Sequence, residues 1–121
     1  MPIAPRERPP IATVLGEYSA FISDDADAVF AALARRVREL SEGASMVLVD
    51  ASERLLVVQG EWWFRGEWRV SVEAAGSDLD YVIVNVAQRA HWAGRLTARS
   101  VLRRAPAEFL TVASAVRDEL E

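Results

Sequence analysis

The most constraining feature of the sequence is a strand-like segment that is apolar on one side only. In EWRVSVEA, which begins at Glu67, the residues Trp68, Val70 and Val72 alternate with charged or small polar residues. Successive side chains of a β-strand point to opposite faces of a sheet, so this strand has one face to bury and one to expose to water. A sheet of such strands needs a second layer over its apolar face.

The C-terminal segment can supply that second layer. In APAEFLTVASAVRDELE, apolar residues recur at helical spacing, and Pro106 lies at the expected first helical position. The apolar stripe consists of Phe109, Val112, Ala113, Val116 and Leu120. We therefore expect a C-terminal amphipathic helix packed on the sheet, preceded by a shorter helical piece over residues 93–104.

The remaining segments predict an α+β fold in the order strand, helix, antiparallel meander. Residues 11–22 are rich in β-branched and aromatic residues and predict a strand. Residues 24–43 predict an amphipathic helix that begins at an aspartate-rich cap and ends at Gly43. Four further β segments begin at Ser45, Arg54, Glu67 and Leu79. The connections between them are short, which favours antiparallel pairing of neighbours.

The length of 121 residues predicts a single domain. Residues 1–10 contain four prolines and are expected to form a flexible arm, whereas residues 11–121 form the domain. The arm lacks the apolar segment of a secretory signal, and no apolar run reaches the roughly 20 residues that span a bilayer. A cytoplasmic protein without membrane insertion is expected.

The stretch EWWFRGEWRV, Glu61 to Val70, predicts a hairpin whose loop length decides where its rings point. A three-residue loop, Arg65 to Glu67, would pair Phe64 with Trp68 and would direct Trp62, Phe64 and Trp68 inward and Trp63 outward. A two-residue loop would instead place Trp62 on the polar side, so the longer loop is favoured. An outward Trp63 is a candidate interface residue for a homodimer.

The order of the elements, the segment FISDDADAVFAALA and the ending APAEFLTVASAVRDELE resemble the START-like superfamily. This superfamily is also called helix-grip, SRPBCC, Bet v 1-like or polyketide cyclase/dehydrase-like. The Val29-Phe30 pair, followed by Leu33, carries the likeness in the first helix. The resemblance implies a curved antiparallel sheet that grips the long C-terminal helix, with a hydrophobic or amphipathic small molecule bound between them.

The space between sheet and last helix can be a ligand cavity or a filled core, because large aromatic side chains can occupy the volume that a ligand would need. The candidate ligand-binding residues are Trp62, Phe64, Trp68, Val70, Tyr81, Asn85, His91, Trp92, Phe109 and Val112. A solid interaction module is the alternative function. A cyclase-like or dehydratase-like enzyme is a third, and it would need Tyr81, Asn85 and His91 to converge on one pocket.

A second candidate site lies in the span from Tyr81 to Ala107, which contains no aspartate or glutamate. Arg95, Arg99 and Arg103 would share one face of a helix there, close to Trp92, and could bind an anion. The alternative is a solvated face whose arginines pair with acids elsewhere. The formal net charge of -4 disfavours attraction of the chain as a whole to nucleic acid or to anionic membranes, although the charge is unevenly distributed along the sequence.

The composition also excludes several kinds of chemistry. The chain has no cysteine and one histidine, so thiolate zinc sites, disulfides and histidine-rich metal centres are excluded. It has no lysine, which excludes Schiff-base chemistry. We therefore expect no metal and no cofactor, and catalysis is less expected than binding.

Overall fold

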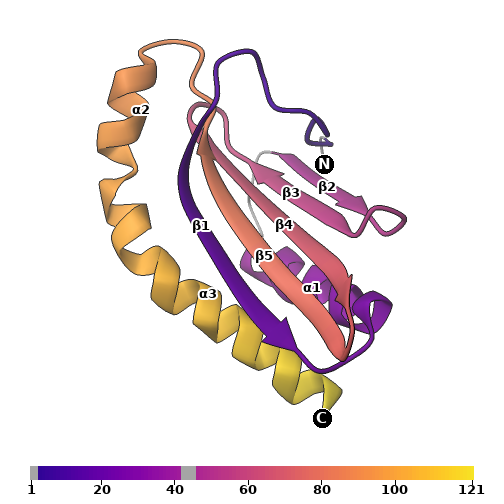
Figure 1. Cartoon of the computed structure of the whole chain (residues 1–121). Helices are drawn as coiled ribbons and strands as arrows, with labels where there is room; N and C mark the ends of the chain where they lie inside the picture. The colour runs from indigo at the N-terminus through magenta and orange to yellow at the C-terminus, as the bar shows by residue number, and fades with distance from the viewer. Residues whose placement is uncertain (1–2, 42–45) are drawn as a thin grey trace.

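The computed structural model describes residues 3–41 and 46–121, and these residues form an α+β fold, as predicted (Figure 1). The described elements are β1 (Thr13–Ile22), α1 (Ala26–Leu40), β2 (Met46–Asp50), β3 (Leu55–Gln59), β4 (Phe64–Glu73), β5 (Gly76–Asn85), α2 (His91–Thr97) and α3 (Arg99–Leu120). The predicted helix stop at Gly43 and strand start at Ser45 lie outside the described residues.

The five strands form one antiparallel sheet in the order β1-β5-β4-β3-β2. Strands β2 to β5 are a meander, and β1 adds to the free edge of β5. The register places Tyr81 of β5 between Tyr18 of β1 and Trp68 of β4. Because alternate residues share a face, Tyr18, Trp68 and Tyr81 lie on one side of the sheet, together with Leu56 of β3 opposite Trp68.

Helices α1 and α3 pack together on this inner face, and α3 runs along the sheet beneath β1 and β5 (Figure 1). The Asp25 side chain caps α1 by accepting hydrogen bonds from the backbone N–H groups of Asp27 and Ala28. The main core joins Leu33 of α1 and Phe109 of α3 to the inner residues of the sheet. The predicted arrangement of a sheet holding a long C-terminal helix is confirmed.

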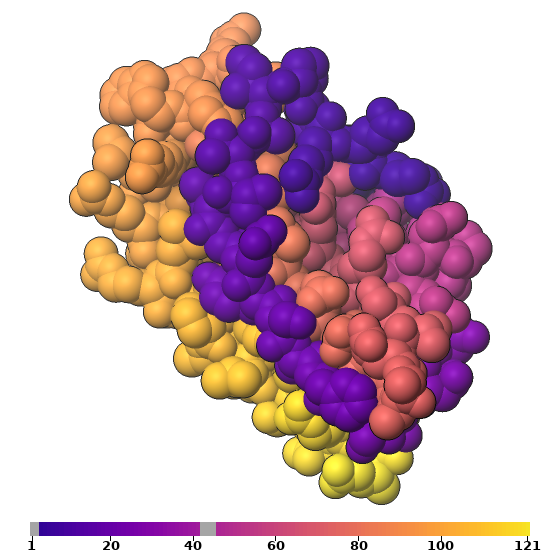
Figure 2. Space-filling model, in the orientation of Figure 1, coloured from indigo at the N-terminus to yellow at the C-terminus, as the bar shows by residue number. Residues whose placement is uncertain are grey.

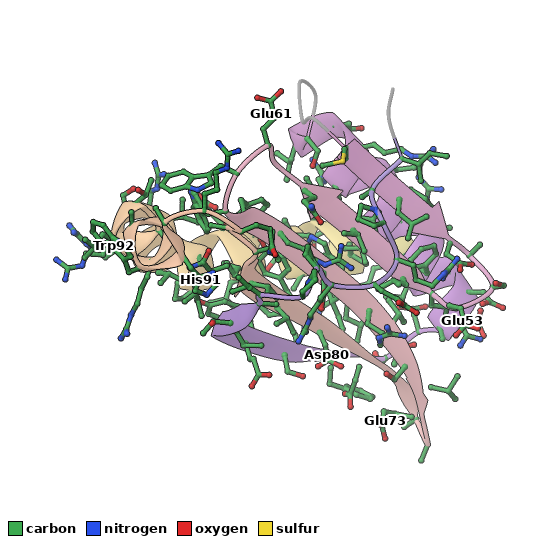
Figure 3. The ribbon with its side chains drawn as sticks, turned by 90° about the horizontal axis from the view of Figure 1, so that it is seen from above. Glu53, Glu61, Glu73, Asp80, His91 and Trp92 are labelled. Atoms are coloured by element: carbon green, nitrogen blue, oxygen red, sulfur yellow. The ribbon has the colours of Figure 1, made fainter. Side chains whose placement is uncertain are left out.

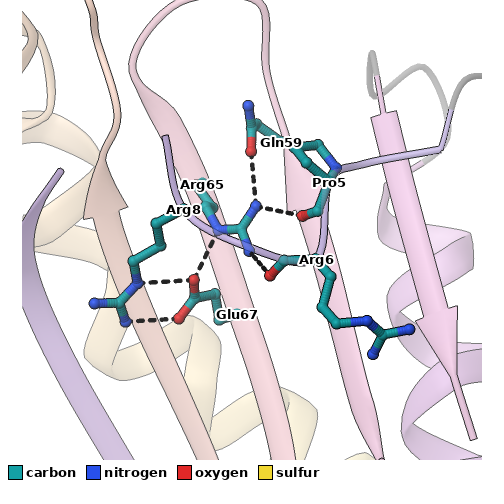
Figure 4. Close-up of polar contacts among 6 residues, drawn as sticks. All are labelled: Pro5, Arg6, Arg8, Gln59, Arg65 and Glu67. Carbon is teal, nitrogen blue, oxygen red and sulfur yellow. Dashed lines mark hydrogen bonds and ion pairs between the residues drawn. The ribbon is translucent and has the colours of Figure 1, made fainter. Parts of the chain in front are cut away.

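The N-terminal segment is extended, as predicted, but it is not a free arm. It lies against the outer face of the sheet, where Ala4 is buried and donates a backbone hydrogen bond to Val47 (Figure 2). The guanidinium of Arg65 is 1% exposed and donates hydrogen bonds to the backbone oxygens of Pro5 and Arg6, as well as to Gln59 and Glu67 (Figure 4). The described part of this segment thus contacts the sheet, and the flexibility of residues 1–10 stays a prediction.

The Glu67 carboxylate links this segment to the sheet, and its titration is expected to make the stability of the fold depend on pH. Partial burial raises its pKa, but hydrogen bonds from Arg8 and Arg65 outweigh that effect, so the pKa lies below its usual 4.5. A lowered folded-state pKa stabilises the fold above pH 4.5, and this stability is lost as the pH falls through the folded pKa.

In urea unfolding at a series of pH values, wild type is therefore expected to lose stability below pH 4.5 more steeply than Glu67→Gln. The other carboxylates are common to both proteins, so their titration cancels in the difference. Parallel curves for the two proteins would contradict this role of Glu67.

The β3–β4 hairpin turns at a different place from the one predicted. Gln59 pairs with Arg65, and the backbone N–H of Gly60 donates to the carbonyl of Phe64, so the loop consists of residues 60–63. Arg65, Gly66 and Glu67, the predicted loop, lie within β4. The register nevertheless keeps the even-numbered residues Leu56, Val58, Phe64 and Trp68 on the inner face, as the alternation predicted.

The C-terminal helix also begins earlier than predicted. Pro106 lies inside α3 rather than at its first position. The predicted preceding helical piece is divided between α2 and the first turns of α3, which are separated by Ala98 in a helical conformation. Proline removes only one backbone N–H, and the buried residues on both sides of it, Ala105 and Phe109, hold the helix against the sheet.

Candidate functional site

A cavity of about 870 Å³ lies between the inner face of the sheet and the two long helices. Its walls come from the C-terminal end of α1, from β3, β4 and β5, and from α3. The lining residues are Val37, Leu40, Ser41, Val58, Gln59, Gly60, Phe64, Trp68, Tyr81, Ala107, Glu108, Phe109, Thr111 and Val112. Leu40, Ala107 and Thr111 are exposed, so the cavity opens to solvent between the helices. Its volume is in the range of small-molecule sites, roughly 300–1,000 Å³.

A group of aromatic rings forms the deepest wall of the cavity. The rings of Trp68 and Tyr81 are stacked with centroids 4.0 Å apart and an interplanar angle of 19°. Phe109 of α3 is parallel to Tyr81 at 6.4 Å, with an angle of 2°. These rings give the cavity an aromatic lining, the kind that favours an apolar or aromatic ligand.

Gly66 leaves room for these rings. It occupies an inner-face position between Phe64 and Trp68, where a Cβ atom would lie 3.0 Å from Cε1 of Tyr81 and 3.1 Å from Cζ of Phe64. Both atoms belong to packed aromatic rings, so an added methyl group has to displace a ring. Glycine at this position therefore keeps the aromatic wall in place.

Gly66→Ala is expected to lower the free energy of unfolding by about 1–3 kcal/mol, because overpacking forces neighbouring rings out of position. Urea denaturation measures the loss. Gly60→Ala is the matched control, since its Cβ would approach no heavy atom closer than 3.7 Å. Equal stabilities for the two variants would show that a methyl group fits at position 66 without displacing the neighbouring rings.

Few polar side chains line the cavity, and two of them, Tyr81 and Glu108, are titratable. Burial raises the pKa of the Tyr81 phenol above its ordinary value, and the negative charge of Glu108 adds to the effect. The phenol therefore stays protonated at neutral pH and can donate a hydrogen bond. Glu108 is exposed at the rim, and its Oε1 atom lies 4.0 Å from Nε of Arg104. The site combines a large apolar wall with a small polar rim.

Five of the ten predicted ligand-binding residues line this cavity, namely Phe64, Trp68, Tyr81, Phe109 and Val112. Val70 is buried in the same core but does not line the cavity. The other four predicted residues do not line the cavity. Asn85, His91 and Trp92 lie where the chain leaves β5 and enters α2, and Trp62 of the β3–β4 loop donates to Arg89 in that connection.

His91 and Asn85 hold that connection together. The Nδ1 atom of His91 lies 2.8 Å from the carbonyl oxygen of Ala87, which makes Nδ1 the donor, and Nε2 lies 2.8 Å from the Thr13 hydroxyl. The Asn85 amide donates to the carbonyl oxygen of His91 and accepts from the N–H of Ala87. Three of these four contacts are to backbone atoms, and the fourth is to the Thr13 side chain. Tyr81 lines the cavity whereas Asn85 and His91 do not, so the three side chains do not converge on one pocket.

The two tryptophans of the β3–β4 loop have the reverse of their predicted orientations. Trp63 is 9% exposed and packs with Ile83 and Ala98 under the start of α3, whereas Trp62 is 42% exposed and donates to the carbonyl oxygen of Arg89. Both residues precede the first residue of β4, so strand alternation does not apply to them. The prediction of an outward Trp63 as an interface residue is wrong.

The predicted anion-binding residues Arg95, Arg99 and Arg103 are all exposed on the outer side of α2 and α3. They do not line the cavity. Within the described ranges, no three histidine, aspartate or glutamate side chains are grouped to hold a metal ion. The same residues contain no helix that is both long enough and apolar enough to cross a bilayer.

The sequence interpretation missed several cavity residues. The sequence identified Val37 and Val58 only as apolar positions of a helix and of a strand. They line one cavity because α1 and α3 cover the same face of the sheet. Glu108 and Thr111 lie beside the apolar stripe of α3. The helical spacing of apolar residues does not distinguish polar residues at a cavity rim from other exposed polar residues. Gly66 does not line the cavity but packs against two rings that do. It has the same parity as Phe64 and Trp68, yet the frequency of glycine in turns favoured a loop there.

Comparison with known proteins yields no match for this chain among family models, curated proteins or solved structures.

Proposed function

We propose that this protein binds a hydrophobic or amphipathic small molecule in the cavity between the sheet and α3. The observation that carries the proposal is an open cavity of about 870 Å³ whose deep wall consists of stacked aromatic rings. A packed interior has few voids larger than a water molecule, so an aromatic-lined space of this size is more than a packing defect. The resemblance of the sequence to START-like proteins supports the same kind of site.

The ligand would place its apolar part against Trp68, Tyr81 and Phe109 and its polar part toward the rim. There it would find the Glu108 carboxylate and the Thr111 hydroxyl. Asn85 and His91, which a cyclase-like or dehydratase-like enzyme would need beside Tyr81, do not line the cavity. Binding is therefore the function that the geometry supports best.

Ala107→Trp is expected to abolish binding of an apolar fluorescent dye such as anilinonaphthalene sulfonate, because an indole at this exposed lining position would fill the mouth of the cavity. Ser114→Trp, at an exposed α3 position that does not line the cavity, is the control and should bind the dye as wild type does. Absence of dye binding to the folded wild type, or equal binding by Ala107→Trp, would overturn the proposal.

A further inference from the structure

The end of the molecule formed by α2 carries an exposed surface that is both basic and apolar. Arg95, Arg99 and Arg103, named here the basic face, recur every four residues along α2 and the start of α3 and are exposed. Trp92 and Leu96, the apolar pair, lie at the same helical spacing and are 71% and 49% exposed. Residues three and four apart on a helix are neighbours, so these five side chains form one continuous outer face.

The arginines of this face form no ion pair within the described part of the chain. Among the described residues, the ion pairs found do not include any arginine of the basic face. Trp92 lies at an extreme end of the molecule with nitrogen-tipped side chains around it, and Glu61 of the nearby loop points in another direction (Figure 3). Large exposed aromatic side chains next to unpaired positive charge indicate a surface that receives a partner.

Charge is also segregated along the length of the molecule. The acidic residues of the β4–β5 hairpin and of the α3 C-terminus, such as Glu73 and Asp118, lie at the end opposite α2 (Figure 1). The basic face therefore lies away from these acids, so a negatively charged surface can attract the α2 end despite the net charge of -4. The charge distribution orients the α2 end toward an anionic partner.

We propose that the α2 end docks on the surface of an anionic phospholipid bilayer. The basic face contacts lipid phosphates, and the apolar pair enters the headgroup region without crossing the membrane. Tryptophan and arginine are the side chains suited to this interface, because the indole ring is amphipathic and the guanidinium binds phosphate. A bilayer fits better than single-stranded nucleic acid, because the face is the convex outer side of a helix, whereas single strands are held in grooves.

The test uses sedimentation with vesicles of phosphatidylcholine alone and vesicles of an equal mixture of phosphatidylcholine and phosphatidylglycerol. Wild type is expected to bind the mixed vesicles, to bind those of phosphatidylcholine far more weakly, and to be released by salt. Replacing Arg95, Arg99 and Arg103 together by glutamine should weaken binding about 100-fold, roughly fivefold for each arginine.

The matched control replaces three other exposed arginines, Arg36, Arg38 and Arg69, by glutamine and should leave binding to mixed vesicles unchanged. Quenching of Trp92 fluorescence by brominated acyl chains, lost in Trp92→Ala, should report entry of the indole into the headgroup region. Unfolding curves establish that the variants are folded.

Three outcomes would contradict the proposed docking of the α2 end on a bilayer. Failure of wild type to bind the mixed vesicles would do so, as would equal weakening by the two arginine triples. Tighter binding to single-stranded RNA than to vesicles, lost in the Arg95, Arg99 and Arg103 variant, would assign the face to nucleic acid instead. The proposal does not depend on occupancy of the cavity.

Discussion

Replacing Arg65 with leucine is expected to lower the free energy of unfolding by about 3–5 kcal/mol, the usual cost of breaking a buried ion pair by removal of one partner. The Arg65 side chain is 1% exposed and donates to Glu67, Gln59 and the backbone oxygens of Pro5 and Arg6. Leucine would leave Gln59 and the backbone oxygens of Pro5 and Arg6 without this donor, and Glu67 with Arg8 as its remaining donor. Equilibrium unfolding in urea measures the loss.

Arg69→Leu is the matched control, because Arg69 lies four residues further along β4 on the same outer face and is exposed. A change within about 0.5 kcal/mol is expected there. The variants Arg65→Leu and Glu67→Gln should also cost less together than the sum of their separate effects, since they share one network. Equal losses at Arg65 and Arg69 would mean that the contacts with the N-terminal segment contribute little stability.

Trp68→Ala is expected to cost about 3–5 kcal/mol, the range for removing a large buried aromatic side chain. Trp68 is 6% exposed and stacks on Tyr81 in the centre of the sheet. Its removal enlarges the cavity and also deprives the wall of its largest ring. Chemical denaturation should show the loss of stability, and dye titration should show weaker binding in the protein that remains folded.

Trp92→Ala provides the comparison for this second variant. Trp92 is 71% exposed, so its replacement is expected to change stability by no more than about 0.5 kcal/mol. A large loss at Trp92, or a small one at Trp68, would contradict the division of the tryptophans into core and surface residues.

The fold could be predicted from the sequence because its strands and helices carry strong periodic patterns. The alternation around Trp68 and Val70 required a covering layer, and the stripe on α3 provided one. The hairpin turn could not be placed in the same way. Gly66 and Gly60 are both typical of turns, and only the packing of Tyr81 and Phe64 against the space above Gly66 requires that glycine to lie within β4.

The site was predicted in part for the same reason. Phe64, Trp68, Tyr81, Phe109 and Val112 were predicted as wall residues because they occupy inner positions of strands and of the last helix. Trp62 and Trp63 were reversed because alternation ends where the strand ends. Their burial depends on the position of α2, which brings Ala98 and Gly94 close to Trp63.

The sequence by itself determined the α+β class, the inward face of the sheet and the helix that covers it, since period-two and period-3.6 patterns record which side of each element avoids water. The tertiary structure decided the rest. It placed the turn, docked the N-terminal segment on Arg65, and left an open space beside Trp68 and Phe109. Such features depend on the volumes and distances between elements far apart in the chain, which local patterns do not contain.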